Sequence, residues 1–404
     1  MRLIVVLALL LAGCAGSDDR RPPTPLQREL SELAETMEVS HPDLFHDVPR
    51  ATFRAEAAEL ADTAPELTRD ELVVGLMRLA ALPGPRDGHT ALYPFDQHAR
   101  GLHVYPLRLY DFADGLHVVG SLGQEDLTGR RVTAIGGAPI DEVVELVRPL
   151  VPHDNESGFR WLLPEYLTTA EVLRGLGIVD GDTATFTFAD GTEAALEPVD
   201  AGEVASTLGG APAPLPTEHD PVWLRDLATD QWLTTLEGGE VVYLGYRLTT
   251  GPTHDTAERL FALARKPGVR RVIVDVRLNH GGDNTTYRPL LGVLARPAVQ
   301  RKLVVLTGRS TFSAAGNFVA DVDRTTSARF VGEPAGGAPS QWGDSIAIML
   351  EHTGLTVHVA TVYWEFGPPG DTRKETPVDV RVEPTAADFF AGRDPALARA
   401  LALP

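Results

Sequence analysis

The expected fold is decided by two stretches, Arg271-Val-Ile-Val-Asp-Val-Arg-Leu-Asn-His-Gly-Gly-Asp-Asn284 and Leu306-Thr-Gly-Arg-Ser-Thr-Phe-Ser-Ala-Ala-Gly-Asn317. Both include or follow a continuous apolar run, Val272 to Val276 in the first and Leu303 to Leu306 in the second. Such runs are typical of strands that are covered on both faces, as in a parallel sheet. Because helical patterns alternate with these strands along the chain, the sequence predicts an α/β architecture.

Each strand is followed by residues that suit an active site. Gly281-Gly282 allows a positive φ and a close approach of the backbone. Ser313 lies among small residues where a helix is expected to begin. A hydroxyl beside a helix N-terminus, with glycine amides nearby, is a common arrangement for a serine nucleophile and its oxyanion hole. The alternatives are that Ser313 only caps the helix and that the glycines form an ordinary turn.

Together the two stretches resemble the tail-specific, or C-terminal-processing, serine protease family, which includes the tricorn core protease and interphotoreceptor retinoid-binding protein. The resemblance lies in Asp275-Val-Arg-Leu-Asn-His-Gly-Gly282, in Thr311-Phe-Ser-Ala314 and in Val331-Gly-Glu-Pro-Ala-Gly-Gly337. It implies a ClpP/crotonase-like spiral ββα core with Ser313 as the nucleophile.

Four further segments extend the resemblance. His41-Pro-Asp-Leu-Phe45 and Asp87-Gly-His-Thr90 resemble motifs of the non-lysine branch of that family, and Pro377-Val-Asp-Val380 and Gly392-Arg-Asp-Pro395 resemble segments that many members share. Their order and spacing extend the resemblance from about Leu26 to the end of the sequence.

The general base is predicted to be a histidine. Many family members use a lysine in a segment that falls here at Ala335-Gly-Gly-Ala338, which has none, and no other lysine sits in a suitable apolar context. The tricorn-like branch uses an earlier histidine, and the matching residue is His89. A histidine pKa near neutrality suits a base that later acts as an acid. The alternative is that His89 only packs or caps at its turn.

Two departures from the tricorn-like pattern leave questions open. Gly88 stands where a serine would link the histidine to a glutamate, so the group that orients His89 is undecided between Glu365, Asp344, Asp371 and a backbone carbonyl. In addition, His280 lies within the glycine turn and could compete as the base.

The predicted oxyanion hole consists of backbone amides, those of Gly281 or Gly282 and of Ala314. Asp275, Arg277 and Asn279 are expected to hold this turn through buried hydrogen bonds rather than to react.

Composition narrows the classes of partner. The formal net charge of −20 disfavours nucleic acid and anionic lipid surfaces as partners. An apolar fraction of 43% is ordinary for a protein with a sizeable core. We found no metal-ligand spacing or nucleotide-binding motif, and no metal or organic cofactor is expected.

The N-terminus predicts a membrane anchor. Residues 1–13 read as a signal peptide, because the apolar stretch Leu3 to Leu11 is too short for an ordinary transmembrane helix. Leu11-Ala-Gly-Cys14 resembles a bacterial lipobox, which implies lipidation of Cys14 and a cell-envelope location. Cys14 is the only cysteine, so an intrachain disulfide and a cysteine nucleophile in the body are excluded.

The expected organisation after the signal peptide has four parts. They are a lipidated tether (14–25), a helical N-terminal domain (26–100), a β-rich and possibly PDZ-like module (101–207) and an α/β serine protease core (208–404). The main boundary is placed in the segment Ala201 to Pro221, which is rich in Gly, Ala and Pro.

The sequence therefore predicts a membrane-anchored serine endopeptidase that cleaves peptides or unfolded protein tails through an acyl-enzyme on Ser313. The alternative is a non-catalytic lipoprotein that binds a peptide or an apolar ligand on the same scaffold. Substrate preference and oligomeric state stay open.

Overall fold

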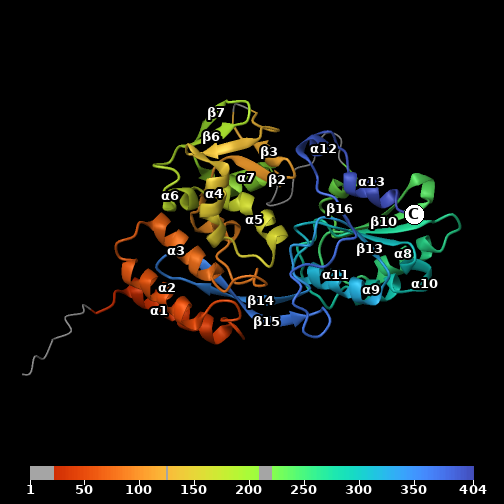
Figure 1. Cartoon of the computed structure of the whole chain (residues 1–404), viewed down its shortest axis with the longest axis horizontal. Coiled ribbons are helices and arrows are strands. Elements are labelled where there is room, and N and C mark those ends of the chain that lie inside the picture. The colour runs from red at the N-terminus through yellow and green to blue at the C-terminus, as the bar shows by residue number, and fades with distance from the viewer. Residues whose placement is uncertain (1–21, 124–125, 209–220) are drawn as a thin grey trace, which may run out of the picture.

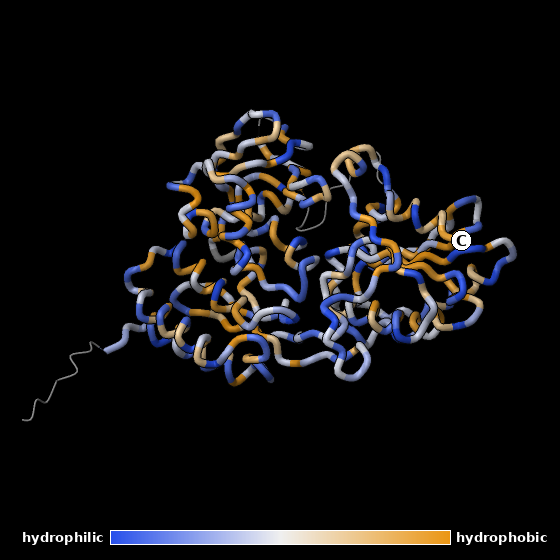
Figure 2. Tube along the Cα trace, viewed as in Figure 1, coloured by the Kyte–Doolittle hydropathy of each residue, from blue (hydrophilic) through white to orange (hydrophobic). Residues whose placement is uncertain are grey.

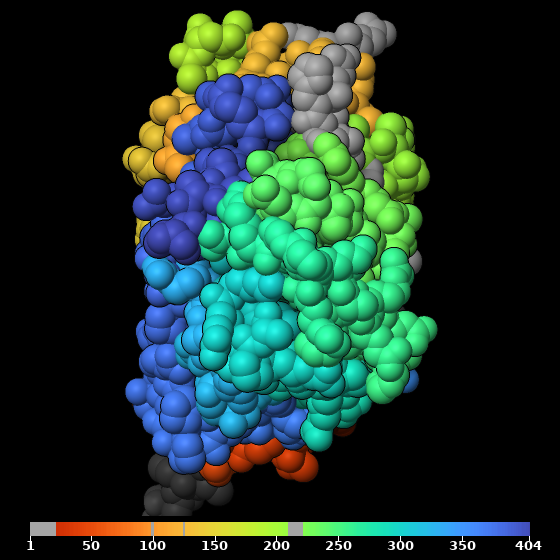
Figure 3. Space-filling view, turned by 90° about the vertical axis from the view of Figure 1, so that its right-hand side faces the viewer, coloured from red at the N-terminus to blue at the C-terminus, as the bar shows by residue number. Residues whose placement is uncertain are grey.

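A computed structural model describes residues 22–123, 126–208 and 221–404 of the chain. Figure 1 shows two lobes, one made of the N-terminal helices and the following module, the other of the C-terminal strands and helices. Figure 3 looks onto the second lobe, whose residues cover the centre of that face, while the N-terminal helices show only at its lower rim.

The elements alternate irregularly along the chain. The α-helices in the described residues are α1 (Pro25–Ser40), α2 (Arg50–Thr63), α3 (Arg69–Ala81), α4 (Ile140–Val147), α5 (Glu156–Thr168), α6 (Ala170–Gly175), α7 (Ala201–Leu208), α8 (His254–Ala264), α9 (Arg288–Leu294), α10 (Pro297–Gln300), α11 (Ala314–Thr325), α12 (Ala386–Phe390) and α13 (Pro395–Leu401). The strands are β1 (His103–Val104), β2 (Leu107–Phe112), β3 (Gly115–Ser121), β4 (Val132–Ile135), β5 (Ala138–Pro139), β6 (Ala184–Phe188), β7 (Glu193–Leu196), β8 (Val199–Asp200), β9 (Gln231–Leu236), β10 (Val241–Tyr246), β11 (Arg271–Asp275), β12 (Leu303–Thr307), β13 (Arg329–Gly332), β14 (Ser340–Met349), β15 (Thr356–Glu365) and β16 (Val380–Arg381).

The N-terminal helices begin at threonine caps. Thr24 before α1 and Thr68 before α3 each complete a capping box with the residue three positions later. Leu30, Leu33 and Met37 form the buried face of α1, as their spacing of three and four residues requires. The N-terminal region is helical, as the sequence predicts.

The module that follows mixes strands with helices. β2 and β3 form a hairpin, and a separate four-stranded sheet has the order β5-β4-β6-β7. The strands expected of a β-rich module are present, and helices α4, α5 and α6 are added to them. One hydrophobic cluster contains side chains of the N-terminal helices and of this module together. The PDZ-like fold stays a prediction.

The second lobe is built on a six-stranded sheet of order β16-β13-β12-β11-β10-β9. Within this sheet, β10, β11, β12, β13 and β16 run parallel to one another. β9 runs antiparallel to β10 at the edge. Alternate residues of β11 point to opposite faces, so Val272 and Val274 join the cluster under α8, α9 and α11, while Ile273 joins the cluster under α13. Figure 2 shows the hydrophobic colour concentrated in these strands, as expected for a sheet covered on both faces.

A long hairpin connects the two lobes. β14 and β15 pair only with each other as named strands, and Figure 1 shows them passing from the second lobe to the N-terminal helices. Val357 and Val359 of β15 belong to the hydrophobic cluster of the first lobe. A bridge between Ala91 and His358 attaches the chain just after His89 to this hairpin. The hairpin therefore fixes the His89 turn against the second lobe.

Several terminal and linker predictions fall outside the described residues. The signal peptide, Cys14 and most of the tether lie there, and Pro25 already begins α1. Within the expected boundary from Ala201 to Pro221, α7 occupies the first part, so that part is helical rather than irregular. Over the part of the chain that the structure describes, no helix is both long and apolar enough to cross a bilayer.

Candidate active site

Ser313 occupies a strained backbone position between strand and helix. It directly precedes α11 and has φ 54° and ψ −128°, a region that non-glycine residues rarely adopt. Its hydroxyl makes no capping hydrogen bond to α11, so the interpretation of Ser313 as an ordinary N-cap is wrong. The side chain is thus held out from the helix by the backbone rather than bound to it.

Gly281 lies against Ser313 so closely that no side chain fits there. A Cβ atom on Gly281 would lie 2.6 Å from Ser313 Cβ and 2.9 Å from the amide nitrogen of Ala314. Gly281 also has a φ of 106°, which only glycine adopts without strain. The Gly-Gly turn after β11 therefore meets the start of α11, as the two stretches of sequence suggested.

Of the backbone amides where the Gly-Gly turn meets the start of α11, some donate a hydrogen bond within the protein and others do not. The Gly281 amide donates to Asn279 Oδ1 over 3.0 Å, so it is already used. No hydrogen bond within the described residues uses the amides of Gly282 and Ala314. Of the alternatives left open by the sequence, the pair formed by Gly282 and Ala314 fits an oxyanion hole better.

His89 reaches Ser313 from the other lobe. Its Nε2 lies 3.0 Å from Ser313 Oγ, and its ring stacks on Phe312 with a centroid distance of 4.5 Å. Withdrawal from water lowers the pKa of His89 to about 4, although Asp87, Asp344 and the Trp342 backbone act in the opposite direction. At neutral pH the imidazole is therefore uncharged and free to accept the hydroxyl proton.

No carboxylate hydrogen-bonds to the far side of His89. Its Nδ1 is buried and has no hydrogen-bond partner of good geometry in the described residues. Each of the three acidic candidates is engaged or placed elsewhere: Glu365 accepts from the Gly370 amide, Asp371 pairs with Arg373, and Asp344 acts on His89 only through its charge. A conventional Ser-His-acid triad is thus incomplete here.

Asp87 supports the turn that carries His89. One carboxylate oxygen accepts from the Thr90 amide over 3.0 Å, and the other lies 3.2 Å from Nε2 of the buried His41. His41 Nδ1 accepts from the Asp43 amide, which leaves the His41 proton on Nε2, facing Asp87. The His41 and Asp87 motifs therefore meet as a buried structural pair.

His280 does not reach the nucleophile. Its ring stacks on Trp161 at 5.3 Å with an interplanar angle of 5°, and no hydrogen bond joins it to Ser313. Burial is the main cause that lowers its pKa to about 4. The geometry thus favours His89 over His280 as the base.

The other polar residues of the first stretch hold the turn in place. Asp275 and Asp394 both pair with Arg277, at 2.5 Å and 2.8 Å. Asn279 Nδ2 donates to the Tyr246 carbonyl, and its Oδ1 accepts from Gly281. These contacts confirm the structural role expected for Asp275, Arg277 and Asn279. Among the described residues there is no cluster of His, Cys, Asp and Glu side chains suited to a metal ion.

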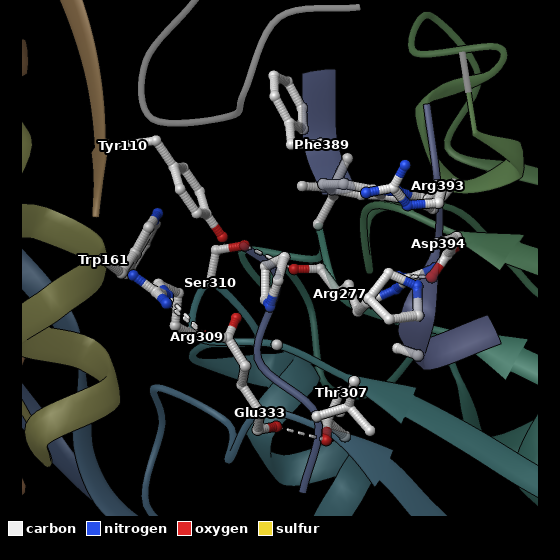
Figure 4. Close-up of a pocket in the computed structure, with 18 residues that line it drawn as sticks. Tyr110, Trp161, Arg277, Thr307, Arg309, Ser310, Glu333, Phe389, Arg393 and Asp394 are labelled. Carbon is white, nitrogen blue, oxygen red and sulfur yellow. Dashed lines mark hydrogen bonds and ion pairs between the residues drawn. The ribbon is translucent and has the colours of Figure 1, made fainter. Parts of the chain in front are cut away.

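A pocket opens beside this site, at the carboxyl ends of β11, β12 and β13. Figure 4 shows Tyr110 and Trp161 on its left side, Phe389 and Arg393 on the opposite side, and Ser310 between them. Trp161 also contacts His280 and Phe312, the neighbours of Gly281 and Ser313. Trp161 therefore connects the pocket with the residues next to Gly281 and Ser313.

Sequence reasoning missed two neighbouring polar residues that join the site's loops. Asp154 accepts from the amides of Gly88 and Ala338, and Asn155 donates to the Ala335 carbonyl over 3.0 Å. Asn155 also caps α5 by accepting from the Gly158 amide. Asn155 is a residue type preferred at helix N-caps, which is a local signal, but its distant partners leave no signal in the sequence.

Comparison with known proteins identifies the fold. No family model and no curated protein sequence matches the chain. Among solved structures, mature CPAF complexed with lactacystin matches with a TM-score of 0.62 at 13% identity, over 91% of this chain and 95% of that chain. A second structure of mature CPAF matches with a TM-score of 0.58 at 14% identity, over 91% and 94%. The photosystem II D1 C-terminal processing protease matches over 92% of this chain and 98% of that chain at 16% identity, with a TM-score of 0.40. The chain thus shares the fold of CPAF at low sequence identity.

Proposed function

We propose that the protein is a serine peptidase in which Ser313 is the nucleophile and His89 is the general base. The observation that carries the proposal is the 3.0 Å contact between His89 Nε2 and Ser313 Oγ, made by residues 224 positions apart in the sequence. The strained φ of Ser313 adds support, since strain of this kind is concentrated at functional sites. The fold shared with CPAF and the resemblance to tail-specific proteases agree with it.

In this mechanism neutral His89 takes the proton of Ser313 as Oγ attacks the carbonyl carbon of a peptide bond. The amides of Gly282 and Ala314 stabilise the negative oxygen that forms. When the carbon–nitrogen bond breaks, His89 gives its proton to the leaving amine, which leaves an acyl-enzyme on Ser313. A water molecule, deprotonated by His89, then releases the acid and restores the hydroxyl.

The substrate class proposed is a peptide or an unfolded protein tail, bound so that a side chain enters the pocket beside Trp161. Apolar and aromatic side chains predominate in that pocket, which favours an apolar substrate residue. We further propose that the protein is tethered to a membrane of the cell envelope through lipid on Cys14. Cell fractionation of a Cys14→Ser variant tests the anchor, because the variant should leave the membrane fraction.

Covalent labelling with a serine-reactive fluorophosphonate tests the nucleophile. The expected result is one adduct per chain, mapped by mass spectrometry to Ser313 and lost in Ser313→Ala and His89→Ala. Circular dichroism of both variants controls for folding. A folded wild-type protein that takes no label would overturn the proposal.

One observation favours a second candidate, a binding protein without catalysis. His89 Nδ1 has no carboxylate partner, so the imidazolium that catalysis needs is less stabilised than in a complete triad. In that case peptides would bind equally well to wild type and to Ser313→Ala, and neither would be cleaved.

A further inference from the structure

Asp154 is a fully buried carboxylate between two loops of the site. Its exposed fraction is 0%, yet it lies in an irregular segment before α5 rather than in a strand or helix. One oxygen accepts from the Gly88 amide over 2.8 Å, and the other accepts from the Ala338 amide over 2.9 Å. A buried carboxylate is costly unless hydrogen bonds compensate it, and both oxygens are compensated here.

The Gly88 amide belongs to the turn that carries His89. The Ala338 amide belongs to a loop that is hydrogen-bonded to the segment before Ser313. Gly88 precedes His89 directly. Ala338 follows Gly337, whose amide donates to the Thr311 carbonyl over 3.0 Å, two residues before Ser313. Contacts therefore run in a closed ring from Ser313 to His89, to Asp154, and back to Ser313 through Gly337.

Among the described residues, no carboxylate hydrogen-bonds to His89 on the side of the ring away from Ser313. His89 Nδ1 lacks an acidic partner, and Gly88 leaves no room for the serine of the tricorn-like relay, because a Cβ there would lie 2.9 Å from the Phe312 ring. The stack on Phe312 and the Trp342 backbone contact the ring, and the rest of its placement depends on the backbone that carries it. Asp154 bonds to that backbone, and Tyr93 Oη donates to the Gly88 carbonyl on its other side.

We propose that ionised Asp154 is a positioning residue, which sets the separation of His89 and Ser313 by binding the amides of Gly88 and Ala338 at once. This inference rests on the proposed peptidase function. The carboxylate is the form that accepts most strongly from both amides, because protonation makes one oxygen a hydroxyl, a weaker acceptor whose own proton needs a partner, and an Asn side chain presents an NH₂ group instead.

The ionisation of Asp154 should therefore appear in the activity. Burial is the largest cause that raises the pKa of Asp154 to about 7; Asp87 raises it further, while the amides of Ala338 and Gly88 and the charge of Arg86 oppose this. The other titratable side chain that bonds to Gly88 is Tyr93, which stays neutral because burial raises its pKa. The rate at which Ser313 reacts should rise as Asp154 loses its proton. This rise should occur at pH values well above those at which His89 titrates.

The experiment measures the rate constant of fluorophosphonate labelling of Ser313 as a function of pH, for wild type, Asp154→Asn and a control. The control is Asp379→Asn, since Asp379 also accepts a backbone amide, that of Phe330 near the start of β13, whereas the site lies at the carboxyl ends of the strands. Wild type should show a step with its midpoint at about pH 7. At high pH, Asp154→Asn should label on the order of ten to a hundred times more slowly and lack the step, because misplacement of a reacting group costs up to about 10²-fold. The control should keep both rate and step.

Labelling of Asp154→Asn at the wild-type rate would overturn the inference, and so would a slower rate that keeps the step. If Asp154→Asn does not fold, Asp154→Glu decides, because the midpoint of the step must move with the altered carboxylate, and an unmoved midpoint refutes the role. Absence of labelling in wild type at every pH removes the peptidase proposal itself. If Ser313 is labelled at the same rate in wild type and in the Asp154 variants, only this inference fails and the peptidase proposal stands.

Discussion

Replacement of Gly281 by Ala should damage both stability and reactivity, for reasons that can be separated. The new Cβ would lie 2.6 Å from Ser313 Cβ and 2.9 Å from both the Ala314 nitrogen and the Phe312 oxygen. None of these atoms is the free end of a flexible side chain, so the backbone itself must shift. Overpacking of this kind costs about 1–3 kcal/mol. The φ of 106° adds about 1–2 kcal/mol for a residue with a Cβ.

The sum, about 2–5 kcal/mol, is a large part of the stability of a typical protein. Reactivity should fall by about 10²–10³, because the methyl group would cover the Ala314 amide that we assign to the oxyanion hole. The assays are urea unfolding, for the free energy of unfolding, and the fluorophosphonate labelling rate, for the reactivity of Ser313.

Gly268→Ala is the matched control, since Gly268 has a φ of 87° and no atom within 4 Å of the added Cβ. It should lose only the conformational part, about 1–2 kcal/mol, and should label at the wild-type rate. If Gly281→Ala, still folded, labels within about threefold of Gly268→Ala, the Ala314 amide is not an oxyanion donor and the reasoning fails.

Three other outcomes follow from the same geometry. His280→Phe should keep the stack on Trp161 and label at the wild-type rate; a loss as large as that of His89→Ala would reassign the base. The pKa of His280 is about 4 in the folded chain and about 6.5 when unfolded, so the unfolded chain binds the extra proton between these values. Wild type should therefore lose stability relative to His280→Phe as pH falls through this window, by up to about 1.4 kcal/mol per pH unit. Trp223→Ala, which removes one wall of the pocket, should raise KM for an apolar peptide with little change in kcat; an unchanged KM would exclude the pocket from substrate binding.

Much of the fold was predictable because its signals are local. The capping boxes at Thr24 and Thr68 and the apolar run of β11 depend only on neighbouring residues, and the strand expected from that apolar run is confirmed. Helices α5 and α6 were missed because α5 is buried on most of its surface and contains Pro164, so it shows no clear amphipathic period. The first part of the expected boundary segment is helical for a related reason, since small residues that suggested a linker form α7.

The candidate site divides in the same way. The glycine pair after one strand, the serine after the next strand and the histidine in an earlier turn could be identified from residue type and order. The structure brings Gly281, Ser313 and His89 together. The sequence did not show which amides are free for an oxyanion hole, because the Gly281 amide donates to the Asn279 side chain. The absence of an acid on His89 in the described residues could not be read from a sequence that contains 56 Asp and Glu residues.

The sequence alone determined the chemistry available to this protein, because a hydroxyl, an imidazole and a glycine turn are properties of residues and their order. Tertiary structure alone decided which of them meet. His89 approaches Ser313 because the hairpin of β14 and β15 and the carboxylate of Asp154 hold segments that are far apart in the chain. Contacts over such separations arise when buried apolar faces and buried polar groups are satisfied together, and no local pattern in the sequence records that condition.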